Sequence, residues 1–372
     1  MKTDHVPHRL RFARERAGLT QADVREKAGI GESSLSEFEN GKREPTLSQL
    51  SSLAAAYRRD VSFFLSTEAL PTEVVRWREK PEGAERVEAT FRQLCEHYHN
   101  LEMWCDARVA CALPSVPTPE RGFNRGVVET LAVRVRRELD LGSRPGPGLL
   151  HAVEERCGLK VFHLDFEPSG AAACTKSPSF GAAVLLNKRN PKWRRNYDLA
   201  HELFHLLTWD FAGSDDAPNS HTWAESEEKL ADSFAAGLLM PADALREAVG
   251  TRLRDGKLPL AALFEIAREF DVSVETLVWR IHVLYGGTPA EKDRAKGMIQ
   301  RAREAASLFE NRTQEVPPER PARFLSLALA ALRAGEISVG RFAEYVGTTR
   351  QRAMQVVEQE LGDDEGLELP AP

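Results

Sequence analysis

The sequence predicts a mainly α, multidomain protein with an all-α N-terminal domain, a central α+β domain and a helical C-terminal region. Apolar residues recur at helical spacing along most of the 372 residues. Two short apolar runs near the middle, 159–166 and 180–186, are typical of strands. A hydrophobic content of 42% provides for two or three domains with separate cores. We expect the divisions 1–66, 67–118, 119–246 and 247–372.

The first domain has the pattern of two short helices joined by a tight turn. Thr20 is a helix cap, Gly29 makes the turn, residues 32–39 form the second helix, and Gly41 with Pro45 ends it. This is helix-turn-helix spacing. Its predicted core is Val24, Ala28, Ile30, Leu35, Phe38 and Leu50. The side chains left exposed on the second helix are Glu32, Ser33, Ser36 and Glu37.

Residues 8–65, with LTQADVREKAGI and LSEFENGKREP, resemble the phage-repressor-like (XRE-type) helix-turn-helix family. The resemblance implies binding to a double-stranded DNA operator. Gln21, Lys42 and Arg43 would contact phosphates, while Glu32, Ser33 and Glu37 would face base edges. Two acidic reading positions predict modest or dimer-dependent affinity. The alternative is a structural or protein-binding helical module.

A polar connector, 66–83, is followed by a long helical pattern over 84–112. Apolar residues in that helix repeat as a heptad seam, which is typical of a coiled coil or of a helix packed on a neighbouring domain. We favour intramolecular packing, because the seam spans fewer than four heptads. Prolines in 113–119 then precede predicted helices over 123–141 and 148–158. The seam consists of Val87, Phe91, Leu94, Tyr98, Leu101 and Cys105.

The predicted helix 193–209 contains the sequence His201-Glu202-Leu203-Phe204-His205. Residues four apart share a helix face, so both imidazoles can reach one Zn²⁺ while Glu202 lies beside them. This H-E-x-x-H pattern predicts a metallopeptidase site in which Glu202 is the catalytic base.

A third zinc ligand is expected on the next helical pattern, 225–239, because catalytic zinc usually takes three protein ligands. Glu228 is the candidate ligand, and Asp232, one turn later, can accept the second N–H of a ligand histidine. We expect Glu225 and Glu227 to form a solvated first turn. His221 competes as the third ligand. The oxyanion-stabilising group stays open among His221, Tyr197, Arg194 and Arg195.

The sequences NYDLAHELFHLL and EKLADSFAAGLLMP resemble the ImmA/IrrE family of zinc metallopeptidases. The resemblance implies a zincin-like central domain with a gluzincin-like site, in which His201, His205 and Glu228 hold zinc. It also implies cleavage of a repressor-type protein. Position 232, more often Asn in that family, is Asp here, which keeps a hydrogen-bond acceptor.

The C-terminal region is amphipathic over 258–284 and 324–361, with helix-to-helix turns at 271–273 and 347–349. Each turn is compatible with another helix-turn-helix, but three-helix packing produces such patterns freely. We therefore expect a ligand-sensing or dimerising role here, with a disordered acidic tail from Gly362.

Composition excludes several classes of protein. The sequence has no run of 18 apolar residues and no apolar core near its N-terminus, so nothing in it predicts membrane insertion or export. Five cysteines without C-x-x-C spacing predict reduced thiols in a cytoplasmic protein.

These features together predict a DNA-binding transcriptional regulator, expected to be a homodimer, whose zinc endopeptidase cleaves a repressor-type protein or the chain itself under stress. The alternative is a repressor or antitoxin-like regulator in which the peptidase fold serves sensing or dimerisation with little proteolysis. A third possibility is a plain peptidase whose helix-turn-helix recruits a protein substrate.

Overall fold

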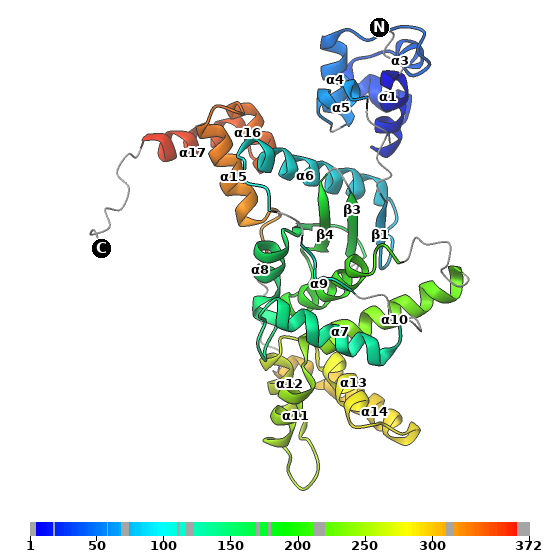
Figure 1. Ribbon diagram of the computed structural model, residues 1–372, viewed down its shortest axis with the longest axis vertical. Coiled ribbons are helices and arrows are strands. Elements are labelled where there is room, and N and C mark those ends of the chain that lie inside the picture. The colour runs from blue at the N-terminus through cyan, green and yellow to red at the C-terminus, as the bar shows by residue number, and fades with distance from the viewer. Residues whose placement is uncertain are drawn as a thin grey trace.

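The structure is a computed structural model (Figure 1). It describes residues 5–17, 19–57, 59–67, 74–109, 112–116, 123–168, 172–177, 180–211, 220–309 and 316–362. The predicted disordered tail after Gly362 lies outside these residues.

Five helices form the N-terminal domain, and all six residues named from the sequence lie in or against its core, Ala28 being partly buried. Thr20 caps the second helix through a reciprocal pair of hydrogen bonds with Asp23, and Gly29 ends it at φ 68°. Since L-residues rarely adopt this φ, glycine suits the turn. The predicted helix-turn-helix is thus present. Its helices are α1 His5–Arg16, α2 Gln21–Ala28, α3 Glu32–Glu39, α4 Leu47–Tyr57 and α5 Val61–Leu65.

A four-stranded sheet lies at the centre of the remaining chain, in the order β1-β3-β4-β2. β1 and β3 pair antiparallel, as do β3 and β4, whereas β2 and β4 are parallel. Its strands are β1 Val75–Trp77, β2 Lys160–Leu164, β3 Ala172–Ser177 and β4 Gly181–Asn187.

Both faces of this sheet are buried. Alternate residues point to opposite faces of a strand, so Ala183 and Leu185 join one hydrophobic core while Ala182 and Val184 join another. A sheet covered on both faces explains why the central strand β4 has a nearly continuous apolar sequence rather than an apolar-polar alternation.

The face with Leu185 is covered by α6 Ala84–Trp104 and α15 Ala322–Arg333 (Figure 1). All six residues of the heptad seam lie in or against this core. The long helix therefore packs within the chain, as expected.

The other face, with Val184, is covered by helices that lead to the candidate site. They are α7 Arg125–Glu138, α8 Gly146–Cys157, α9 Lys192–Leu207 and α10 Ser220–Leu239. The same core continues into α12 Leu260–Glu269, α13 Val274–Leu284 and α14 Pro289–Phe309, with α11 Ala242–Gly250 beside them. After α15 the described chain ends with α16 Val339–Val346 and α17 Arg350–Gly362.

The mainly α fold class, with its helix-turn-helix and its α+β centre, agrees with the sequence analysis. Strands β1 and β3 were not predicted. β1 is three residues long and lies in the segment interpreted as a connector, and β3 consists of small and polar residues, so neither shows strong periodicity. No helix of the described residues is long and apolar enough to cross a membrane.

Candidate metal centre

Helix α9 carries His201 and His205 on its buried side. Pro191 precedes its first turn, and apolar residues at helical spacing pack the helix against the sheet. His201 is fully buried and His205 is 6% exposed. The two Nε2 atoms lie 3.1 Å apart, as expected for histidines one turn apart.

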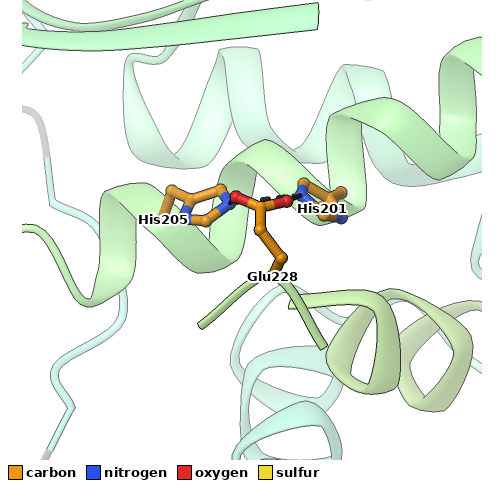
Figure 2. A group of neighbouring side chains, drawn as sticks. All are labelled: His201, His205 and Glu228. Atoms are coloured by element: carbon orange, nitrogen blue, oxygen red, sulfur yellow. Dashed lines mark hydrogen bonds and ion pairs between the residues drawn. The ribbon is translucent and has the colours of Figure 1, made fainter. Parts of the chain in front are cut away.

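Helix α10 brings Glu228 to both imidazoles (Figure 2). One carboxylate oxygen lies 3.1 Å from Nε2 of His201, and the other lies 3.3 Å from Nε2 of His205. One ligand atom from each of the three side chains lies within 4.8 Å of the others. The predicted trio therefore comes together, although Glu228 is 27 positions from His201 in the sequence.

Each imidazole is held by a second carboxylate at its other nitrogen. Nδ1 of His201 lies 3.0 Å from Asp232, as the sequence analysis expected. Nδ1 of His205 lies 3.1 Å from Glu227. The expectation that Glu227 belongs to a solvated first turn is wrong, because α10 begins at Ser220 and places Glu227 in mid-helix, 9% exposed.

These carboxylates favour positive charge at the imidazoles. Burial alone lowers the pKa of His205, but hydrogen bonds with Glu227 and Glu228 outweigh burial and raise the pKa to about 10. Burial likewise opposes the charge on His201, and Asp232 and Glu228 reverse its effect and raise the pKa. Although burial has the opposite effect, the imidazoles hold the pKa of Glu228 far below its usual range. A cation bound between these groups would replace the protons.

The spacing of the donors fits zinc. Zinc bonds of about 2.0–2.1 Å at tetrahedral angles place neighbouring donor atoms about 3.3 Å apart. The two Nε2 atoms are 3.1 Å apart, and a different oxygen of Glu228 lies 3.1 Å from His201 and 3.3 Å from His205, so each neighbouring pair of donors has about this spacing. Because Asp232 and Glu227 lie within hydrogen-bond distance of the Nδ1 atoms, the Nε2 atoms of both imidazoles are left to face the Glu228 carboxylate.

Glu202 lies beside this trio, 1% exposed. Its Oε1 is buried without a hydrogen-bond partner among the described residues. The Cys174 thiol from β3 hydrogen-bonds with Glu202, and burial raises the pKa of that thiol. A buried acceptor oxygen next to two imidazoles is placed to take a proton from a bound water molecule.

Two arginines of the β1 segment reach the site, and the sequence analysis did not identify them. Arg78 lies 3.0 Å from Asp232 and 3.4 Å from Asp198. Arg76 lies 3.8 Å from Glu227, with its guanidinium over the Trp209 ring. The alternation of Val75 and Trp77 with these arginines was the available signal, since it has the period of a strand.

The candidates for oxyanion stabilisation differ in position. The Tyr197 hydroxyl lies 3.1 Å from Asp232, at the edge of the site. Arg194 pairs with Asp198, whereas Arg195 donates to the Asn190 carbonyl and lines a cavity with His163. The side chains of His221 and Glu225 lie outside the described residues.

The candidate DNA contacts lie on or beside α2 and α3. Glu32 and Ser33 are exposed, and Ser36 and Glu37 are half-buried. Lys42 and Arg43 are exposed, and Arg43 pairs with Glu37 at 3.3 Å, so two predicted contacts also hold each other. Gln21 donates to Glu39 at 3.4 Å.

Two segments of the chain are similar to known families, one to a DNA-binding module and one to a metallopeptidase-type domain. Residues 10–64 match the helix-turn-helix family, and residues 154–282 match the IrrE N-terminal-like domain. Both resemblances are thereby confirmed, and they support a DNA-binding regulator with an ImmA/IrrE-like domain. The second match includes the histidines, Glu202, Glu228 and Asp232. No curated protein matches the chain.

Proposed function

We propose that this protein is a transcriptional regulator whose central domain is a zinc-dependent endopeptidase that cleaves a repressor-type protein, separate or its own chain, in a stress response. The observation that carries the proposal is the carboxylate of Glu228, which faces Nε2 of both His201 and His205. Three protein donors of this type are the usual set for catalytic zinc, which keeps another position open.

His201, His205 and Glu228 would hold the zinc, and Asp232 and Glu227 would orient the imidazoles. Zinc bound there would lower the pKa of water and polarise a peptide carbonyl. Glu202 would accept the proton of the attacking water at its buried Oε1 and pass it to the departing amine. The Tyr197 hydroxyl is the nearest described candidate for a hydrogen bond to the substrate.

The proposal is tested with the purified full chain, a proteome-derived peptide library and the substitution Glu202→Gln. We expect zinc to copurify with both forms, and new peptide termini to arise with the wild type alone. Glu247→Gln, an exposed glutamate on α11, is the matched control and should cleave like wild type. Cleavage by Glu202→Gln at the wild-type rate would contradict the mechanism. Zinc binding without cleavage by either form would favour a sensing role for the domain.

DNA binding by the N-terminal domain is tested separately on the DNA upstream of the gene. Lys42→Ala with Arg43→Ala should weaken binding and reduce its salt dependence, since both cations would contact phosphates. Salt-insensitive binding, or none, would favour recruitment of a protein by this domain. Sedimentation of the same sample tests the proposed homodimer.

A further inference from the structure

Helices α16 and α17 repeat the construction of the N-terminal helix-turn-helix. Helices α2 and α16 each have eight residues. Thr20 caps the first and Ser338 the second, in each case through a side chain that accepts from a backbone N–H. Gly29 and Gly347 end them at φ 68° and 71°. The interval from cap to glycine is nine residues in both, and the next helix begins three residues after each glycine.

Two buried positions of the units also coincide. Four residues after the cap stand Val24 and Phe342, both buried. Six residues after the glycine stand Leu35 and Ala353, both fully buried. In each unit these side chains fix the second helix against the first and leave its opposite side to solvent. The shared offsets of cap, glycine and helix start, together with these two buried positions, make the unit similar to the N-terminal one, although α16 also buries Tyr345 where α2 has the exposed Lys27.

The exposed side chains of the second helix differ in a way that favours DNA. At the positions of Glu32 and Ser33 in α3, helix α17 has Arg350 and Gln351, both exposed. Arginine pairs with guanine and glutamine with adenine in the major groove, whereas glutamate repels the phosphate backbone. The same face carries Arg352 and Gln355, which are 3.1 Å apart, in place of Ser34 and Glu37.

The charge of the whole unit changes in the same direction. Residues 20–38 have two basic and four acidic side chains, whereas residues 338–356 have three basic and one acidic. Arg341 is paired with Asp60 and Glu344, so the positive charge presented by α17 is that of Arg350 and Arg352. Such a local positive charge in a chain of net charge −6 favours a polyanion. Helix α17 lies at the outer edge of the molecule, beyond α15 and α16 (Figure 1). A duplex can therefore approach it.

We propose that α15–α17 is a second DNA-binding unit, with α17 as a recognition helix that enters the major groove of double-stranded DNA. Arg350 and Arg352 contact phosphates or guanine, and Gln351 and Gln355 contact base edges. This role goes beyond the proposed function, and it requires neither zinc nor the N-terminal unit.

The test measures binding of the full chain to a mixed-sequence 30-bp duplex and to a random-sequence duplex pool. Arg350→Ala with Arg352→Ala should weaken duplex binding about tenfold or more and lower the slope of log K against log salt by about two. Gln351→Ala with Gln355→Ala should abolish the enrichment of one short sequence motif in the duplexes selected from the pool. The slope of log K against log salt should stay unchanged. All four side chains are exposed, so the variants should unfold at the wild-type temperature.

Arg294→Ala with Arg301→Ala removes two exposed arginines of α14 and is the matched control for charge. The proposal is overturned if the α17 arginine variant binds duplex DNA within twofold of this control. It is also overturned if the loss appears with single-stranded RNA and not with duplex DNA. If the Lys42 and Arg43 variant binds normally while the α17 variant fails, the N-terminal assignment is wrong and this one holds.

Discussion

Glu227→Ala should weaken zinc binding by an amount that the geometry of the site indicates. Removing the carboxylate that orients a ligand histidine typically costs ten- to a hundredfold in metal affinity, about 1.4–2.7 kcal/mol. Glu227 is buried and lies 3.1 Å from Nδ1 of His205, which favours a large effect. Arg76, 3.8 Å away, also forms an ion pair with the Glu227 carboxylate, and this competing contact reduces the expected effect on His205. We therefore expect a loss of about tenfold or more.

The assay is competition with a chromophoric zinc chelator, together with thermal unfolding of the zinc-free protein. Glu227→Gln keeps an acceptor for Nδ1 and should lose about threefold or less. Glu247→Gln on the surface of α11 should bind like wild type. A folded Glu227→Ala protein with zinc affinity within twofold of wild type would show that Glu227 does not orient His205.

Three further predictions concern stability. Burial, then the charge of Arg320, lowers the pKa of His97 from 6.5 to about 3, so its contribution is complete above pH 6.5 and is lost as the pH falls. Hence the free energy of unfolding of His97→Phe should fall less than that of wild type between pH 7 and pH 5, and the difference should be about 2 kcal/mol. Urea titrations at both pH values measure it, and equal losses would refute the reasoning. Gly347→Ala should destabilise more than the roughly 1–2 kcal/mol expected for Gly29→Ala, because its Cβ would also displace the Arg320 guanidinium, whose Nε donates to the Tyr345 carbonyl. Equal melting temperatures of the two variants would contradict this. Phe324→Ala should cost about 3–5 kcal/mol, since this fully buried ring fills the core beneath α6, and a loss below about 1 kcal/mol by denaturant unfolding would show that the core collapses around it.

The sequence predicted best those features that depend on local spacing. The Thr20 cap, the Gly29 turn and the pairing of His201 with His205 each depend on residues within one or two turns, and all are present. The approach of Glu228 could also be predicted, because zinc chemistry requires a third donor. The helical pattern of α10 offered a carboxylate in the right region.

Features that depend on tertiary pairing were missed. β1 is ordered by antiparallel pairing with β3, a hundred residues later, and three residues have too little periodicity to reveal it. Without β1, no argument from sequence brings Arg76 and Arg78 to the metal site. Glu227 was missed because its role depends on where α10 begins: the helical pattern was taken to start at 225, whereas the helix starts at Ser220.

The core shared by α6 and α15 affects the order in which the chain can fold while it is synthesised on the ribosome. Chains emerge from the N-terminus, and contacts within the emerged part can form first. The residues of the metal centre lie within 75–239, so they emerge well before α15. The opposite face of the sheet, with Phe162 and Leu185, is covered by α6 and by α15, which carries Phe324. Until α15 has emerged from the ribosome, of these two helices only α6 can cover this face. A nascent chain paused near residue 310 would therefore expose an apolar surface to which chaperones bind.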